Sequence, residues 1–184
     1  MAIIMPVDNI PPGYRFYRPL IEGVAARFGL DPLVVAAVCW QESGFSADGF
    51  RFEPKFWNRY LKHVPRWGAH NPRRISSSYG LMQVMAVVAI EDGTLLATEP
   101  PEVLFTPERG LIAGCTRLLN LSTWAYRLPL SEADKQLATL AAYNGGRGAN
   151  DKPPFRNGAY AREVLAKLAV LQRGQPPATP STTT

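Results

Sequence analysis

The chain has 184 residues, of which 46% are hydrophobic and 10% aromatic, and this composition excludes a disordered protein and predicts one domain with a real core. Its net charge of +5 predicts an anionic partner, but the basic residues look scattered and form no nucleic-acid-binding motif, so a polyanionic surface fits equally well. No apolar run approaches the roughly 20 residues of a membrane span, so no membrane insertion is expected.

The cysteines, the histidines and the N-terminal residues bear on whether disulfides, a metal site or a signal peptide are expected. Cys39 and Cys115 each fall on an apolar helical stripe, which favours two buried free thiols and leaves a single bridge open. His63 and His70 lack metal-ligand spacing, so neither a metal nor a cofactor is expected. Residues 1–16 lack the basic segment and the long apolar run of a signal peptide, which predicts synthesis in the cytoplasm without a leader.

In chain order, the first expected helix covers residues 14–28 and ends at Gly29. The second begins the stretch DPLVVAAVCWQESGF at residues 31–45. Asp31 can cap the free amides of its first turn, and Pro32 stands at the first helical position, where its missing N–H costs nothing.

Glu42 ends an otherwise apolar stripe of this second helix. Val35, Val38 and Cys39 precede it at helical spacing, and the opposite stripe is apolar too. Gly44 ends the helix directly afterwards. Burial and the negative end of the helix dipole both disfavour a charged carboxylate and predict a raised pKa for Glu42. A raised pKa suits a general acid near neutral pH, although a glutamate that reaches water at the end of a core helix gives the same pattern.

Residues 44–75 are aromatic and basic and are interrupted by prolines. They predict one short helix over residues 54–61 and at most a small hairpin. Their aromatic side chains fit either one wall of a groove or a satellite core. These are Phe50, Phe52, Phe56, Trp57, Tyr60 and Trp67.

A further helix is expected after Met85, as far as about Ile90, and others at residues 107–126, 132–144 and 159–171. Thr106 and Ser131 are expected to cap the starts of the helices at 107–126 and 132–144. The apolar stripe of the helix at 132–144 ends in Asn144 just before two glycines, as the earlier stripe ends in Glu42. Residues 174–184 are rich in Pro and Thr and are predicted to be disordered. The fold class is therefore all-α with at most a small hairpin, in a single domain over residues 1–173.

Three stretches follow one another in a characteristic order: Glu42-Ser43 at a helix end, Gly-Leu-Met-Gln at 80–83, and Ala-Tyr-Asn-Gly-Gly at 142–146. With the helices between them, they resemble the soluble lytic transglycosylase family over about residues 18–171. That family has the fold of the lysozymes, so the resemblance implies a lysozyme-like helical domain with a substrate cleft.

The resemblance implies that Glu42 is the sole catalytic acid and base. It implies contacts with N-acetylated sugars for Met82 and Gln83, and a role for Tyr143 in holding Glu42. The complete set of implied substrate-binding residues is Ser43, Tyr79, Met82, Gln83, Tyr143, Asn144 and Tyr160. The implied substrate is the glycan strand of peptidoglycan, bound by a monomer, without nucleic acid as a partner.

A single carboxylate suffices for glycan cleavage if the substrate assists. The acetamide of N-acetylmuramic acid would stabilise C1, its own C6 hydroxyl would attack, and the product would be a 1,6-anhydro sugar. Well-oriented intramolecular attack can contribute about 7–11 kcal/mol. A hydrolytic lysozyme in which Asp48 or Glu53 positions a water stays open as the nearest alternative. A non-catalytic wall-binding or virion structural module is the alternative from another class.

In two places the sequence departs from the pattern common in bacterial members of this family, and both departures favour a phage origin. Tyr79 replaces a small residue before the glycine, and the 44–75 insert is long; both look more like phage-encoded, endolysin-like relatives. With no leader expected, they suggest a phage or prophage lysin that is released by a holin or carried in a virion and acts on the wall in the periplasm.

Overall fold

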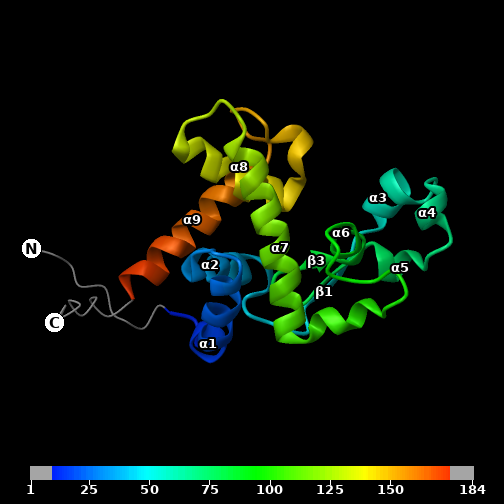
Figure 1. Cartoon of the computed structure of the whole chain (residues 1–184), viewed down its shortest axis with the longest axis horizontal. Helices are drawn as coiled ribbons and strands as arrows, with labels where there is room; N and C mark the ends of the chain where they lie inside the picture. The colour runs from blue at the N-terminus through cyan, green and yellow to red at the C-terminus, as the bar shows by residue number, and fades with distance from the viewer. Residues whose placement is uncertain (1–9, 175–184) are drawn as a thin grey trace, which may run out of the picture.

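The computed structural model describes residues 10–174 (Figure 1). The long helices of this part are α1 (Pro12–Arg27), α2 (Pro32–Ser43), α7 (Pro107–Tyr126), α8 (Glu132–Gly145) and α9 (Gly158–Arg173). The short elements are β1 (Phe50–Phe52), α3 (Pro54–Phe56), the π-helix η2 (Trp57–Leu61), α4 (Pro65–Gly68), α5 (Pro72–Ile75), β2 (Ser77–Tyr79), β3 (Val84–Met85), α6 (Ala86–Glu91), and the 3₁₀-helices η3 (Pro101–Phe105) and η4 (Arg147–Ala149).

The predicted fold class is confirmed, because helices dominate and one small sheet accompanies them. The sheet has the order β1-β2-β3 with antiparallel neighbours. It therefore extends beyond the hairpin expected within residues 44–75. Phe50, Arg51 and Phe52 alternate in character as a strand does, and they pair with residues 77–79.

Helix ends follow the local sequence signals in most places. The side chain of Asp31 accepts a hydrogen bond from the Leu33 amide at 2.8 Å, and that of Ser131 accepts one from the Asp134 amide at 3.1 Å. Gly44 caps α2 in the left-handed conformation at φ 61°. The cap predicted at Thr106 has the right backbone conformation but makes no side-chain hydrogen bond.

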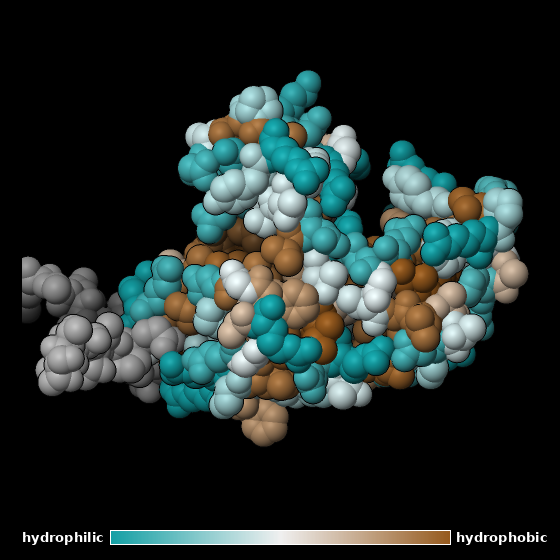
Figure 2. Space-filling view, in the orientation of Figure 1, coloured by the Kyte–Doolittle hydropathy of each residue, from teal (hydrophilic) through white to brown (hydrophobic). Residues whose placement is uncertain are grey.

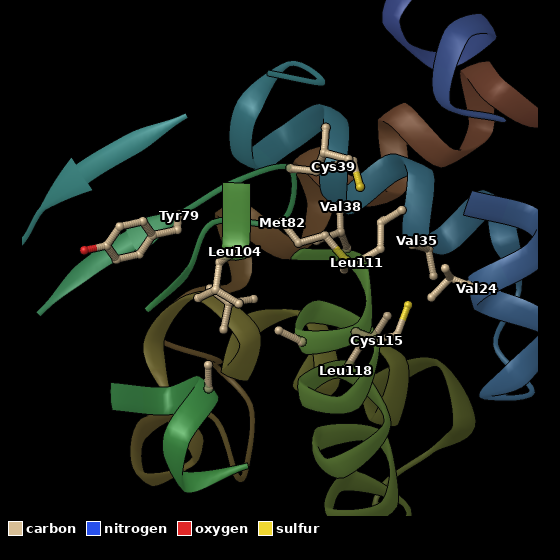
Figure 3. Close-up of a cluster of buried hydrophobic side chains, with 14 of the residues drawn as sticks. Val24, Val35, Val38, Cys39, Tyr79, Met82, Leu104, Leu111, Cys115 and Leu118 are labelled. Carbon is tan, nitrogen blue, oxygen red and sulfur yellow. The ribbon is translucent and has the colours of Figure 1, made fainter. Parts of the chain in front are cut away.

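One part of the hydrophobic core is formed by buried side chains of α2 and α7 (Figure 3). Val35 and Val38 of α2 and Leu111 of α7 are fully buried, and each such side chain contributes about 1.5–3 kcal/mol by leaving water. Cys39 and Cys115 are buried free thiols on the same two helices, as the sequence favoured. Burial raises the pKa of Cys115 to about 12, so it is inert as a nucleophile at neutral pH.

The segment from α3 to α5 forms a separate lobe at the right of Figure 1, beyond the sheet. Leu61 and Trp67 are its anchors, each 4% exposed, whereas Tyr60 is 52% exposed. The aromatic side chains of the insert thus divide between a satellite core and the surface. Figure 2 shows a notch in the outline between this lobe and the part that carries the end of α8, above the sheet.

No helix in residues 10–174 is long and apolar enough to cross a membrane. The predicted disordered tail lies outside the described residues except for Gly174, which caps α9. The N-terminal residues on which the leader prediction rests are also largely outside them.

Candidate active site

Glu42 lies in the last turn of α2, between the start of α9 and the strand β1. The hydroxyl of Tyr160, in the first turn of α9, donates a hydrogen bond to Glu42 Oε1 at 2.5 Å. This contact joins residues 118 positions apart in the sequence. The buried helix α2 brings the carboxylate to a fixed place, and α9 supplies the group that orients it.

Burial raises the pKa of Glu42, as the sequence predicts. The hydrogen bond from Tyr160 and the positive charge of Arg51 act in the opposite direction and hold part of this rise back. Burial, and next to it the nearby carboxylate, raise the pKa of Tyr160, so the phenol stays protonated and keeps the proton that it donates to Glu42. The site therefore holds a carboxyl group whose pKa is raised and whose charged form still has two stabilising partners, as a group that acts first as an acid and then as a base requires.

Two further hydrogen bonds bring the three sequence motifs together. Ser43, next to Glu42, donates from Oγ to the carbonyl oxygen of Leu81 at 2.8 Å. Tyr143 donates from its hydroxyl to the carbonyl oxygen of Met82 at 2.9 Å. Both side chains thus bind the backbone of the 80–83 turn, which fixes this turn against the ends of α2 and α8.

The turn itself depends on Gly80. Its φ of +71° disfavours other residues, and a Cβ there would come within 2.3 Å of the Leu104 carbonyl oxygen. Gln83 follows with a positive φ of 47°, and its side-chain amide donates to the Gly80 carbonyl oxygen at 3.0 Å. A Cβ on Gly49 would lie 2.7 Å from the same amide nitrogen, so Gln83 packs closely over the backbone at Gly49.

The structure changes three of the implied roles. Tyr143 does not supply the hydrogen bond to Glu42; Tyr160 does, because α9 rather than α8 places a hydroxyl beside the carboxylate. Met82 is 0% exposed and packs against Gly114 of α7, so its side chain has no surface for a sugar. Tyr79 is 1% exposed and its hydroxyl donates to the Arg74 carbonyl oxygen, which makes it a core residue.

Asn144 is exposed at the end of α8, and its side-chain oxygen accepts a hydrogen bond from Asn157 at 2.8 Å. Asn157 is in turn bound by the fully buried Asn150, which also donates to the Gly146 carbonyl oxygen. The two asparagines fix the loop between α8 and α9 and so the start of the helix that carries Tyr160. Sequence reasoning missed both, because asparagines in a loop broken by prolines are typical of ordinary turns.

Arg51 is the other residue that sequence reasoning missed, and it acts electrostatically on Glu42 from β1. The alternation of Phe50, Arg51 and Phe52 was a signal for a strand with an outward-facing cation. Its Nε is also 2.5 Å from the carboxylate of Glu53. A hydrolytic mechanism would need a second carboxylate to position a water, and this ion pair occupies Glu53, one of the two candidates for that role.

The other candidate second acid, Asp48, is solvent-exposed and accepts a hydrogen bond from the Ser46 hydroxyl. That hydrogen bond lowers the pKa of Asp48. Within residues 10–174, the charged group found to act on the Glu42 carboxylate is Arg51, not a carboxylate. The same residues hold no group of three His, Cys, Asp or Glu side chains suited to a metal.

The helical architecture and a single partly buried glutamate held at a helix end define a lysozyme-like domain. Residues 19–165 match the family described as the Transglycosylase SLT domain, and the chain belongs to that family. Its sequence is 26% identical over 160 residues to membrane-bound lytic murein transglycosylase C of Photorhabdus laumondii subsp. laumondii. The match covers 83% of this chain but 38% of that protein.

The fold is also similar to a solved structure, that of an inactive mutant of the lytic transglycosylase Slt from Pseudomonas aeruginosa. The TM-score is 0.57 at 19% sequence identity, over 87% of this chain and 25% of the other. This likeness concerns the fold. The chain therefore corresponds to less than half the length of each of these two relatives.

Proposed function

We propose that this protein is a peptidoglycan lytic transglycosylase that cleaves the bond between N-acetylmuramic acid and N-acetylglucosamine. The observation that carries the proposal is the Glu42 carboxylate, which is partly buried, has a raised pKa and receives a hydrogen bond from Tyr160. Membership of the Transglycosylase SLT family and the names of the two relatives support the same activity.

In the first step, protonated Glu42 donates its proton to the glycosidic oxygen, and the bond from that oxygen to C1 breaks. The acetamide oxygen of the same muramic acid stabilises the positive charge at C1. In the second step, Glu42, now a carboxylate, takes the proton of the C6 hydroxyl, and O6 bonds to C1. The product is 1,6-anhydro-N-acetylmuramic acid, no water is consumed, and Glu42 is again protonated.

Tyr160 and Arg51 suit this cycle because Glu42 must alternate between its two protonation states. Burial alone would favour the neutral acid throughout, whereas the hydroxyl and the guanidinium stabilise the carboxylate formed in the first step. We propose Gln83 and Asn144 as sugar contacts, because their side-chain amides suit N-acetyl groups. For Ser43 and Tyr143 we propose a positioning role on the 80–83 turn instead.

Mass spectrometry of the products released from purified peptidoglycan tests this proposal. Anhydro-muropeptides, lighter by one water than the products of hydrolysis, are the expected result. Reducing-end products would instead assign a hydrolytic lysozyme, and binding without release of fragments would assign a non-catalytic wall-binding module.

We also propose that the protein is a phage or prophage lysin that acts as a monomer. The long insert with its Glu-Pro-Lys-Phe-Trp run at residues 53–57 supports this origin. Co-expression with a holin should then trigger lysis of the host, and light scattering should give the mass of one chain.

A further inference from the structure

The basic residues of this protein are spread over the chain, but its net positive charge lies in one segment. Residues 51–74, here called the basic lobe, contain seven of the 20 Lys and Arg residues and one of the 15 acidic residues. The basic lobe therefore carries a charge of +6, while the remainder of the chain carries −1. In the fold these residues form β1 from Arg51 onward and the lobe beyond the sheet (Figure 1).

Most of these cations are free to bind an external anion. Arg51 pairs with Glu53 and Arg74 with Glu102, which neutralises two of them. The other five are exposed and have no carboxylate partner among residues 10–174: Lys55, Arg59, Lys62, Arg66 and Arg73. A folded protein that needed only solubility would intersperse acids here, because like charges repel.

Three of the arginines lie over aromatic rings. The guanidinium carbons of Arg59, Arg66 and Arg73 lie 5.3, 4.2 and 5.7 Å from the centroids of the Tyr60, Trp67 and Phe50 rings, respectively. The face of an aromatic ring attracts a cation at such distances, and the guanidinium keeps N–H groups that can donate to a carboxylate. The basic lobe therefore presents planar donors whose geometry suits carboxylates.

The position of the basic lobe connects it to the candidate active site. β1 is its first element, and Arg51 of that strand acts electrostatically on Glu42. Arg73, from α5, lies over Phe50, the residue that precedes Arg51 in the strand. These two contacts place the first strand of the lobe and Arg73 on the side of the molecule where Glu42 lies.

We propose that the basic lobe binds the carboxylates of the peptide stems on the glycan strand that occupies the site, and so selects stem-bearing over stem-free strands. This inference rests on the proposed function and adds a determinant of substrate choice to it. A stem is joined to the lactyl carboxyl as an amide, so a stem-bearing muramic acid loses that carboxylate and presents the several carboxylates of its peptide instead. Stem-free strands present one lactyl carboxylate per disaccharide. The affinity for stem-bearing over stem-free strands should therefore fall when lobe cations are removed and when the salt concentration rises.

The test compares two double variants with the same change in net charge, each in the Glu42→Gln background so that bound wall is not cut. K55E/K62E reverses two lobe cations that are exposed and not stacked on a ring. R15E/R173E reverses two exposed cations in α1 and α9, at the opposite end of the molecule in Figure 1. Both lower the net charge by four, so a difference between them reports position rather than total charge.

Sedimentation with insoluble stem-bearing peptidoglycan at low salt is the measurement, repeated after an amidase has removed the stems. We expect K55E/K62E to bind stem-bearing wall at least about fivefold more weakly, as two lost charge pairs would allow, and to bind stem-free wall within about twofold of its parent. R15E/R173E should match the parent on both. Equal weakening by the two variants, or equal weakening on both walls, overturns the proposal.

Two further arms separate this inference from its rivals. Tighter binding of the lobe to anionic lipid vesicles or to DNA than to stem-bearing wall, lost in K55E/K62E, would assign a different partner and overturn it. Release of fragments from stem-free strands by the protein with Glu42 intact tests the proposed function alone. If fragments appear but the lobe variant binds stem-bearing wall normally, only the stem-binding inference fails.

Discussion

Two regions meet at Glu42, and they are built in opposite ways. On one side are long helices such as α2 and α7, of 12 and 20 residues, whose apolar faces are fully buried. On the other side is the basic lobe, with helices of three to five residues, exposed rings and unpaired cations. The long helices define where the carboxylate stands, whereas the lobe offers charge and surface from a scaffold with few buried anchors. Because the lobe has few buried anchors, we expect it to open at a lower free energy than the long helices.

The largest effect is expected from removing the proton that Glu42 transfers. Glu42→Gln keeps the shape of the side chain and its hydrogen bond from Tyr160 but removes the proton that is transferred. We expect activity on peptidoglycan to fall by about 10²–10⁴-fold with the circular dichroism spectrum unchanged. Glu132→Gln, the same exchange at an exposed position, is the control and should retain full activity. Activity of the Glu42 variant above a few per cent would remove this residue from the acid role.

Anchor deletions test whether the two regions unfold separately. Trp67→Ala should lower the free energy of unfolding by about 3–5 kcal/mol, because that ring is buried in the lobe. We expect this loss to be confined to residues 54–75. Leu111→Ala in α7 should cost about 2–5 kcal/mol across the whole domain. Hydrogen exchange followed by mass spectrometry distinguishes the two. Equal loss of protection in α7 for both variants would show that the lobe is part of one cooperative unit.

A packing variant probes the helical side alone. A Cβ on Gly114 would lie 2.2 Å from the Met82 sulfur, so Gly114→Ala should displace that side chain and lower stability by about 1–3 kcal/mol in urea unfolding. The shift would also disturb the turn that Tyr143 holds. Gly23→Ala is the control, because a Cβ there meets nothing within 4 Å and α1 should gain about 0.5–1 kcal/mol. A neutral Gly114 variant would mean that this contact relaxes freely.

Tyr160→Phe should cost about 0.5–1.5 kcal/mol of stability and shift the pH profile of activity. The hydrogen bond from Tyr160 holds the pKa of Glu42 down, so its loss raises that pKa further. Because cleavage starts from protonated Glu42, the alkaline limb of the profile should move to higher pH. Tyr143→Phe should leave the alkaline limb of the pH profile unchanged, because the Tyr143 hydroxyl donates to the Met82 carbonyl oxygen and not to Glu42. The opposite ranking of the two variants would restore the role first implied for Tyr143.

The smallest expected effect is on stability against pH. Folded Glu42 has a pKa above its unfolded value of about 4.3, so the protein takes up a proton on folding between the two values. The free energy of unfolding therefore decreases as pH rises between these two pKa values. Gln does not titrate, so Glu42→Gln should not show this decrease. The melting temperature of the variant relative to the parent should rise from pH 4 to pH 7. A constant difference would mean that burial does not perturb this carboxylate.

Local signals predicted the helices well because they act within a few residues. Asp31 and Pro32 begin α2, Gly44 ends it, and Ser131 begins α8, all as expected. The strands were harder, since a three-residue strand such as β1 exists through its partner in residues 77–79. At the site, Glu42 was identifiable from its stripe, but the partner of its carboxylate was not.

The sequence by itself determined the class of the fold, the position of the candidate acid and the direction of its pKa shift, because helix period, caps and burial are encoded locally. Only the tertiary structure decided that Tyr160 rather than Tyr143 donates a hydrogen bond to Glu42, that Met82 and Tyr79 are core residues, and that the basic segment starts in a strand near Glu42. Those outcomes depend on which distant elements pack together, and side chains 118 residues apart meet only when the whole core has formed.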